Sequence, residues 1–328
     1  MSTYDQFKSL MRERKYQEAI DLAEREAHKS SPPNGFWLNQ QALALTRTGD
    51  CTTAVQVCDK ALTLQPDNPF SLIFRSDALL KLDDVKGALT GFEEALRNPR
   101  VAERARRGVL HCLAELKEWE RMRSVLASWD VPDQRIYPYK VKALMGLGRN
   151  EEAMEVCDKW LKESPDNKMA LWHMVELEVA RDGLESVRVR YEKLAKIPSR
   201  PPVYGEIHAS LCKRAGKMDK ALGQYDKLQA KTTDPSIMRR KAFALAKSGR
   251  ELEAIPMLEE MLRAQPDDFY LHSSYQGACR RSKNLERAWR FYHELHAMHP
   301  DNKALFGRIR RVKKDLERCE EKKSESEI

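Results

Sequence analysis

The sequence predicts an all-α fold, a right-handed solenoid of stacked antiparallel helix pairs, on three observations. A small side chain recurs about every 34 residues, a glycine often stands five residues before it, and a proline often stands twelve residues after it. A repeat of about this length is typical of a helix–turn–helix unit that cannot bury its own apolar face alone. The small-residue column consists of Ala19, Ala54, Ala88, Met122, Ala153, Val187, Ala221, Ala254 and Ala288.

Each repeat is expected to begin with a helix that ends at a left-handed glycine, because glycine has no Cβ to oppose that conformation. The second helix should place the small residue at the closest helix crossing and an aromatic ring one turn later on the same face. The turn glycines are Gly49, Gly148, Gly216 and Gly249. The aromatic rings are Phe92, Tyr191, Tyr225 and Tyr292.

The second helix is expected to end at a proline, which cannot continue a helix, and the Asp or Asn that follows can cap the next one. These prolines are Pro66, Pro165, Pro266 and Pro300, each followed by Asp and then Asn or Asp. The repeat around Met122 is the least regular, since neither a turn glycine nor this proline marks its ends. The segment Val131-Pro132-Asp133 beside it predicts a local change in curvature.

These columns resemble the tetratricopeptide repeat family, whose 34-residue unit carries a Leu-Gly, Tyr, Ala, Phe and Pro pattern. The segment from Lys142 to Asn167 is one of the best copies, and the resemblance covers roughly residues 2–302. It implies a binding surface made of about nine repeats. The expected repeats are 1–34, 35–68, 69–102, 103–133, 134–167, 168–201, 202–234, 235–268 and 269–302.

The end of the chain is expected to close the array. Leu305, Ile309, Val312 and Leu316 recur at helical spacing, with charged residues on the opposite face, as in the polar capping helices of solenoids. We therefore predict a capping helix at 303–323 and a disordered tail at 324–328.

The compartment is expected to be the cytoplasm. The N-terminus lacks a basic-then-apolar signal region, and no stretch approaches the length of apolar residues needed to span a membrane. The seven cysteines are scattered, odd in number and contain no C-x-x-C pair, which suits a reducing compartment and a role as small core hydrophobes.

No catalytic apparatus is predicted, and no cofactor or metal ion. The sequence has no Gly-rich phosphate loop and no nucleophile elbow. His293, His296 and His299 are spaced three apart along a helix, which could offer metal ligands, but the zinc-protease helix motif needs a different spacing. We interpret them as an exposed helix edge and expect a protein that is not an enzyme.

The resemblance implies that the first helix of each pair faces the concave groove, at fixed offsets before the small residue. Applied to this sequence, these offsets predict a groove surface with mainly apolar residues in the first three repeats, basic residues in the fourth and fifth, and a mixture in the later ones. The candidate partner-binding residues are Asn39, Phe70, Ile73, Arg104, Arg107, His111, Arg135, Lys142, Trp172, Arg239, Phe243 and Tyr270.

The main contact is expected in the fourth and fifth repeats. Arg104, Arg107, Arg135 and Lys142 should lie on one continuous wall, where four like charges would repel one another until a carboxylate-bearing segment docks. Phe70 and Ile73 upstream, with Trp172 downstream, should hold apolar residues of the same segment. The expected ligand is a protein or peptide segment with acidic and apolar residues, held by a non-catalytic scaffold or adaptor.

Two other functions stay open. The net charge of +8 and a pI near 9.0 are compatible with a nucleic-acid-associated helical-repeat protein, and basic residues cluster at 97–107 and 303–323. However, 50 acidic residues are interspersed with the 58 basic ones, which makes the excess modest. A regulatory subunit of a separate enzyme is the third possibility.

Overall fold

The computed structural model describes residues 2–129, 133–300 and 302–326, with side chains for all of these except 133, 134, 303 and 319–326. Within those ranges the regular secondary structure is entirely helical and includes no strand. The predicted all-α fold of stacked helix pairs is therefore confirmed. Val131 and Pro132 of the predicted change in curvature, and Asp301 of the last Pro-Asp-Asn turn, lie outside the described residues.

The described part of the chain contains nineteen helices, and the first eighteen form nine consecutive pairs. Odd-numbered helices up to α17 are called first helices here, and the even-numbered ones second helices. The bounds in the first half of the chain are α1 Thr3–Arg12, α2 Tyr16–Ala27, α3 Gly35–Thr48, α4 Cys51–Leu64, α5 Pro69–Lys81, α6 Val85–Ala95, α7 Ala102–Glu115, α8 Trp119–Ser128, α9 Asp133–Gly146 and α10 Asn150–Glu163. In the second half they are α11 Lys168–Asp182, α12 Leu184–Ala195, α13 Pro202–Arg214, α14 Met218–Gln229, α15 Pro235–Lys247, α16 Glu251–Ala264, α17 Phe269–Arg281, α18 Leu285–Met298 and α19 Lys303–Ser326.

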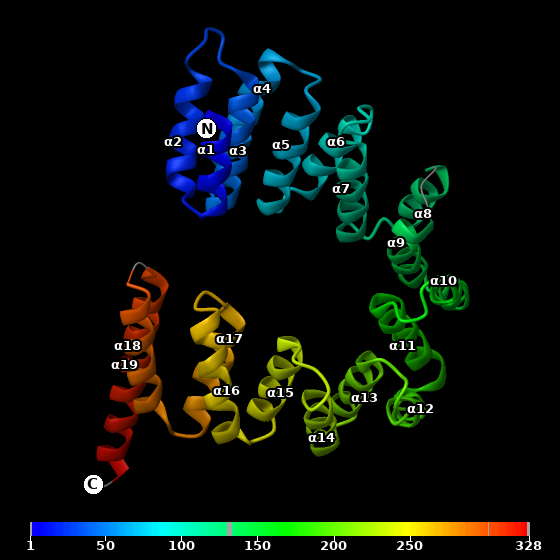
Figure 1. The fold of residues 1–328 in the computed structure, drawn as a ribbon, viewed down its shortest axis with the longest axis vertical. Helices are drawn as coiled ribbons and strands as arrows, with labels where there is room; N and C mark the ends of the chain where they lie inside the picture. Colours follow the sequence, from blue (N-terminus) through cyan, green and yellow to red (C-terminus); the bar gives the residue numbers. More distant parts are fainter. Residues whose placement is uncertain (1, 130–132, 301, 327–328) are drawn as a thin grey trace. The chain divides into compact units, whose positions relative to one another are not determined.

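The helices divide into two compact units, Met1–Pro165 with α1 to α10 and Asp166–Ile328 with α11 to α19. Within each unit, every helix contacts the next one along the chain, and Figure 1 shows these neighbours lying side by side. First helices of neighbouring repeats also contact each other, as α3 does α5 and α5 does α7. Each unit is thus a stack of helix pairs.

A residue with positive φ follows the first helix in all nine repeats, although the sequence predicts glycine there in only four. Gly49, Gly148, Gly216 and Gly249 have φ between 71° and 94°, and Gly183 has φ 83° one position further along its repeat. In the other four repeats a residue with a side chain takes this conformation, with φ between 56° and 65°. These residues are Arg14, Asp83, Lys117 and Lys283. The turn geometry is therefore more regular than the sequence that forms it.

The core of each unit lies between its helix pairs, as the small-residue column predicts. All nine members of that column are fully buried, including the larger Met122 and Val187. The rings of Phe92, Tyr191, Tyr225 and Tyr292 are also buried. The six described cysteines are free and buried, and burial raises the pKa of the Cys58 and Cys157 thiols to about 12. These thiols are core side chains in their second helices.

Helix α19 packs against α18 through Leu305, Ile309 and Val312, which are all buried. The helix continues to Ser326, three residues beyond the predicted end of the capping helix, and residues 327 and 328 lie outside the described ones. None of the helices in the described part is both long and apolar enough to cross a membrane.

Candidate partner-binding surface

The N-terminal ends of four consecutive first helices place the same repeat position on the surface of the first unit. This position, eighteen residues before the small residue, holds Phe36 on α3, Phe70 on α5, Arg104 on α7 and Arg135 on α9. We call these four residues the first-helix strip. Phe36 is 47% exposed and Phe70 is 43% exposed, which is a large exposure for phenylalanine. The strip therefore reads as two aromatic rings followed by two guanidinium groups.

Asparagine caps set the start of the two aromatic helices. The Asn34 side chain accepts a hydrogen bond from the Phe36 backbone N–H at 3.0 Å, and the Asn68 side chain accepts from the Phe70 N–H at 3.1 Å. Such a cap satisfies a backbone donor that the first turn of a helix leaves unpaired. Because both helices begin at the same repeat position, their phenylalanines fall in the same register.

The aromatic end of the strip extends into the first repeat. The ring of Tyr4 on α1 lies edge-on to that of Phe36, with 5.3 Å between centroids. Trp37 contacts both Phe36 and the buried Phe7 in edge-on geometry. These packed rings form an exposed apolar surface across α1 and α3.

The two arginines of the strip are each paired with a carboxylate from the preceding first helix. Arg104 forms an ion pair with Asp77 on α5, and its guanidinium lies 5.0 Å from the centroid of the Phe74 ring. Arg135 pairs with Glu103 on α7 at 3.2 Å, and both side chains are about two-thirds exposed. The predicted wall of four mutually repelling cations is therefore wrong for Arg104 and Arg135, because neighbouring repeats supply their counter-charges.

Three other predicted basic residues are exposed on the first helices α7 and α9, namely Arg107, His111 and Lys142. Among the side chains that the structure describes, none makes an ion pair with them. Among the predicted basic residues, Arg107 and Lys142 are thus open to an acidic ligand.

Two predicted groove residues are covered by neighbouring helices. Asn39 is 4% exposed, and its side-chain oxygen accepts a hydrogen bond from the buried Ser71 hydroxyl at 2.8 Å. Ile73 is 1% exposed and lies in the core of the first unit. Asn39 thereby joins α3 to α5, and Ile73 packs among the buried residues of α5 to α9, so neither side chain is exposed to a ligand. The position of a residue in the repeat does not reveal whether a neighbouring helix covers its side chain.

In the second unit, a buried carboxylate connects three first helices. Glu206 on α13 is 3% exposed and receives Lys168 of α11 at 2.8 Å and Arg240 of α15 at 2.5 Å. The Arg240 guanidinium also lies 5.8 Å from the centroid of the half-buried Trp172 ring. Arg240 was not among the predicted site residues, although it follows Glu206 by 34 residues and the repeat period itself indicates the contact.

The remaining predicted residues of the second unit lie on α15 and α17. Arg239 makes two hydrogen bonds to Asp268, at 2.8 and 3.2 Å, and its guanidinium lies 5.3 Å from the Phe243 ring. Tyr270 is 69% exposed and packs edge-on against the exposed Phe269. This stretch combines open aromatic surface with a guanidinium that is already paired.

Lys213 on α13 lies near two other cations, Lys247 and Arg240, so this part of the second unit has a positive potential. Partial burial, followed by the nearby cations Lys247 and Arg240, lowers the pKa of the Lys213 ammonium below its ordinary value. A lysine in such surroundings is stabilised in its charged form by an added anion.

The histidines of the last repeat pack against aromatic rings. His293 lies against Trp289 with 4.3 Å between ring centroids, and His296 lies 6.3 Å from Phe306. No group of three or more His, Cys, Asp or Glu side chains in the described ranges is placed to hold a metal ion.

A family model described as "Tetratricopeptide repeat" matches residues 1–199, which is more than half of the chain. Among solved structures, yeast Tom70 is 13% identical, with 96% of each chain covered and a TM-score of 0.41. A tetratricopeptide repeat protein from Parabacteroides merdae is 15% identical, with 85% of this chain and 98% of that chain covered and a TM-score of 0.38. Because this family model matches more than half of the chain, the chain belongs to the tetratricopeptide repeat family.

Proposed function

We propose that this protein is a non-catalytic scaffold or adaptor that holds a segment of a partner protein along the first helices of its first unit. The tetratricopeptide fold is generally a scaffold for protein–protein interaction. The observation that carries the proposal is the exposure of Phe36 and Phe70 at one repeat position, together with the exposed Arg107 and Lys142 on the following first helices, which form no ion pair with the described side chains.

The chemistry of these residues selects the ligand. Exposed rings in register on neighbouring helices are suited to anchoring apolar side chains of an extended segment. Arg107 and Lys142 are suited to carboxylates, because charge-assisted hydrogen bonds to a carboxylate are roughly twice as strong as neutral ones. The ligand that fits both is a peptide with apolar residues at one end and acidic residues at the other.

The second unit offers a similar combination. Trp172, Phe243 and Tyr270 supply aromatic surface, and Arg239 and Arg240 supply guanidinium groups. These guanidinium groups already pair with Asp268 and Glu206. We therefore assign the primary contact to the first unit and a supporting contact to the second.

A panel of labelled synthetic peptides tests this proposal by fluorescence anisotropy with the full-length chain. The first peptide has a Leu- and Phe-rich end and an Asp- and Glu-rich end. The second replaces the acidic residues by lysine, the third replaces the apolar residues by serine, and a single-stranded RNA of similar length serves as the fourth probe. We expect the first to bind about tenfold or more tightly than the second and third, a difference of about 1.4 kcal/mol.

The salt dependence separates the nucleic-acid alternative. Binding of RNA through phosphates alone weakens steeply as salt increases, because each neutralised phosphate releases a counterion. If RNA is bound more tightly than every peptide at physiological salt, the scaffold proposal is contradicted.

A further inference from the structure

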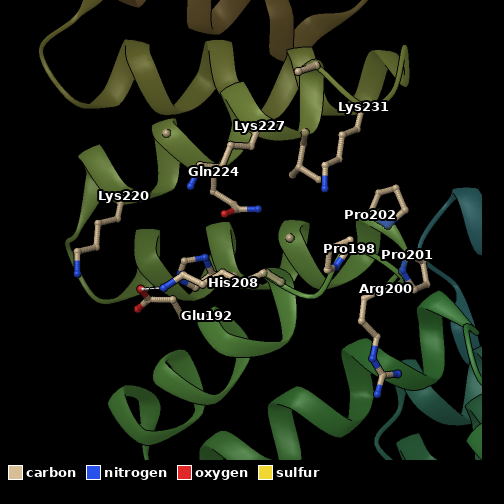
Figure 2. Close-up of a pocket in the computed structure, with 16 residues that line it drawn as sticks. Glu192, Pro198, Arg200, Pro201, Pro202, His208, Lys220, Gln224, Lys227 and Lys231 are labelled. Carbon is tan, nitrogen blue, oxygen red and sulfur yellow. Dashed lines mark hydrogen bonds and ion pairs between the residues drawn. The ribbon is translucent and has the colours of Figure 1, made fainter.

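A pocket of about 800 Å³ lies in the second unit, away from the predicted partner-binding residues. It is bounded by the end of α12, the connection at 196–201, and helices α13 and α14 (Figure 2). Pockets that hold small molecules typically measure roughly 300–1,000 Å³ and combine apolar walls with a few polar groups. Here Pro198, Pro201, Pro202 and Leu228 supply the apolar wall.

The charge of this pocket is strongly positive. Its lining contains one carboxylate, Glu192, which already receives Arg188 at 3.0 Å and Lys196 at 3.1 Å. Five cations line the pocket, namely Lys196, Arg200, Lys220, Lys227 and Lys231. Among the described side chains, none forms an ion pair with Lys220, Lys227 or Lys231. Figure 2 shows Lys220 at one end of the pocket and Lys231 at the other, near the prolines.

A buried histidine in the pocket lining lacks a hydrogen-bond partner on one nitrogen. His208 is 5% exposed, and its Nε2 lies 3.2 Å from the Cys212 sulfur. Burial raises the pKa of the Cys212 thiol, so the sulfur keeps its hydrogen and can donate it to Nε2. When the thiol donates in this way, the imidazole hydrogen is on Nδ1, which is buried and makes no hydrogen bond. A donor left in this state favours any ligand that brings an acceptor.

Gln224 on α14 adds an uncharged polar side chain to the lining. Figure 2 shows its side chain extending from α14 toward the His208 ring on α13. A carboxamide can turn to present either its donor or its acceptor face. A ligand anion in the pocket can therefore accept a hydrogen bond from the Gln224 amide or from the His208 Nδ1–H.

Gly223 leaves the pocket open on the α14 side. It lies inside a helix, where glycine is disfavoured, yet a Cβ added there would meet no atom within 4 Å. By contrast, a Cβ at Gly205 would lie 2.7 Å from the Gln224 Nε2. Packing therefore explains the glycine at 205 but not the one at 223, where a side chain would enter the open space of the pocket.

From this geometry we infer that the pocket binds a small phosphate ester, with the phosphate beside Lys220 and Lys227 on α14 and the apolar body against the prolines at the other end. Four of the five cations are lysines, whose compact ammonium groups suit phosphate as point charges and require no planar fork. A pocket of this volume suits a small molecule better than an extended chain. The site is separate from the first-helix strip, so its test is independent of the proposed scaffold function.

Isothermal titration calorimetry of the full-length chain tests the inference with 2-naphthyl phosphate, which combines an apolar ring with a phosphate monoester. The controls are inorganic phosphate, 2-naphthol, and a short peptide that contains phosphoserine. We expect one naphthyl phosphate per chain, bound at least about tenfold more tightly than any control. Absence of saturable binding, or equal binding of inorganic phosphate or 2-naphthol, overturns the inference. Tighter binding of the phosphopeptide also overturns it, since the ligand would then be a modified protein.

Two variants test whether the ligand binds in this pocket. Gly223→Leu should fill the open space, and the double variant Lys220→Gln with Lys227→Gln should remove charge at the phosphate end without adding bulk. Each should weaken binding about tenfold or more. Lys193→Gln, on α12 but outside the pocket lining, is the matched control and should bind like the parent. If Gly223→Leu does not fold by circular dichroism, the lysine variant decides alone, and unchanged binding in it overturns the assignment.

Discussion

At the scale of single residues, the turn after each first helix imposes one backbone conformation on side chains of very different chemistry. Arg14, Asp83, Lys117 and Lys283 adopt the left-handed region that glycine adopts elsewhere in the chain. For a residue with a Cβ, this conformation costs roughly 1–2 kcal/mol. The surrounding helix pair must therefore offset the cost in four of the nine repeats.

Substituting Lys117→Gly should stabilise the chain, because it removes this cost. Glycine also increases the conformational entropy of the unfolded chain, which offsets part of this effect. The free energy of unfolding should therefore rise by roughly 0.5–1 kcal/mol. The matched change Gly148→Ala, at the same position of the next repeat, should destabilise by a similar amount. Chemical denaturation of both variants measures the difference, and a destabilised Lys117→Gly would show that its side chain makes a compensating contact.

Two buried histidines should make the second unit sensitive to pH. Burial is the main cause that lowers the pKa of His272 and of His208 below the ordinary value of 6.5. His272 stays neutral between two partners, with Nε2 2.8 Å from the Pro266 carbonyl and Nδ1 3.1 Å from the Tyr292 hydroxyl. Below pH 6.5 the unfolded chain takes up protons that the folded chain does not, so stability should fall as the pH falls through 6.5. Stability should stop falling once the pH is below the pKa that these histidines have in the folded chain.

Urea denaturation at several pH values, from neutral to about pH 5.5, measures this slope. Carboxylates titrate at lower pH, so they contribute little in this window. His272→Gln should have a shallower slope than the parent. An unchanged slope would mean that other groups cause the pH dependence.

At the scale of helices, the sequence period predicted which residues meet inside a repeat, and the structure places them there. The small-residue column is fully buried because each member stands where two helices cross closely. The exposure of the first helices was less predictable. Ile73 and Phe70 are three residues apart on α5, yet one is covered by a neighbouring helix and the other is open.

The ion pairs of the first helices depend on contacts between repeats, and the predicted offsets did not include them. Asp77 on α5 pairs with Arg104 of the next repeat. Glu103 lies one position before the offset of Arg104 and pairs with Arg135. Whether a charged side chain turns to a neighbour or to a ligand depends on side-chain geometry that a one-dimensional period does not contain.

The helix crossings should tolerate little added volume. Ala54 on α4 has no exposed surface and lies in the core of the first unit. Ala54→Leu should force neighbouring side chains out of their preferred rotamers and cost roughly 1–3 kcal/mol. Ala127→Leu, at an exposed position on α8, is the control and should change stability little. Equal stability of the two variants by thermal denaturation would contradict the close crossing.

At the scale of the whole molecule, contacts between neighbouring repeats replace a single central core. The chain divides into two compact units at residues 165 and 166. Stability in such arrays is approximately a sum of repeat and nearest-neighbour terms, so parts of the array can unfold separately.

Unfolding should therefore be less cooperative than in a globular domain of equal mass. Differential scanning calorimetry should give a van't Hoff enthalpy smaller than the calorimetric enthalpy, because more than one unit unfolds. Hydrogen exchange should show different protection in the two units. Equal enthalpies, with uniform protection along the chain, would indicate a single cooperative unit.

The central claim is that a partner segment binds along the first helices of the first unit through Arg107 and Lys142. The most direct test is the affinity of the acidic–apolar peptide for the double variant Arg107→Glu with Lys142→Glu. Reversing Arg104 is less informative, since a glutamate there would face Asp77. The matched control, Lys60→Glu with Lys86→Glu, makes the same change of charge at exposed positions on the second helices α4 and α6.

We expect the first-helix variant to bind the peptide about tenfold or more weakly, while the control binds like the parent and both keep the parent's melting temperature, because exposed charges contribute little to stability. If the first-helix variant binds as tightly as the parent, or if the control loses affinity to the same degree, the first helices are not the binding surface.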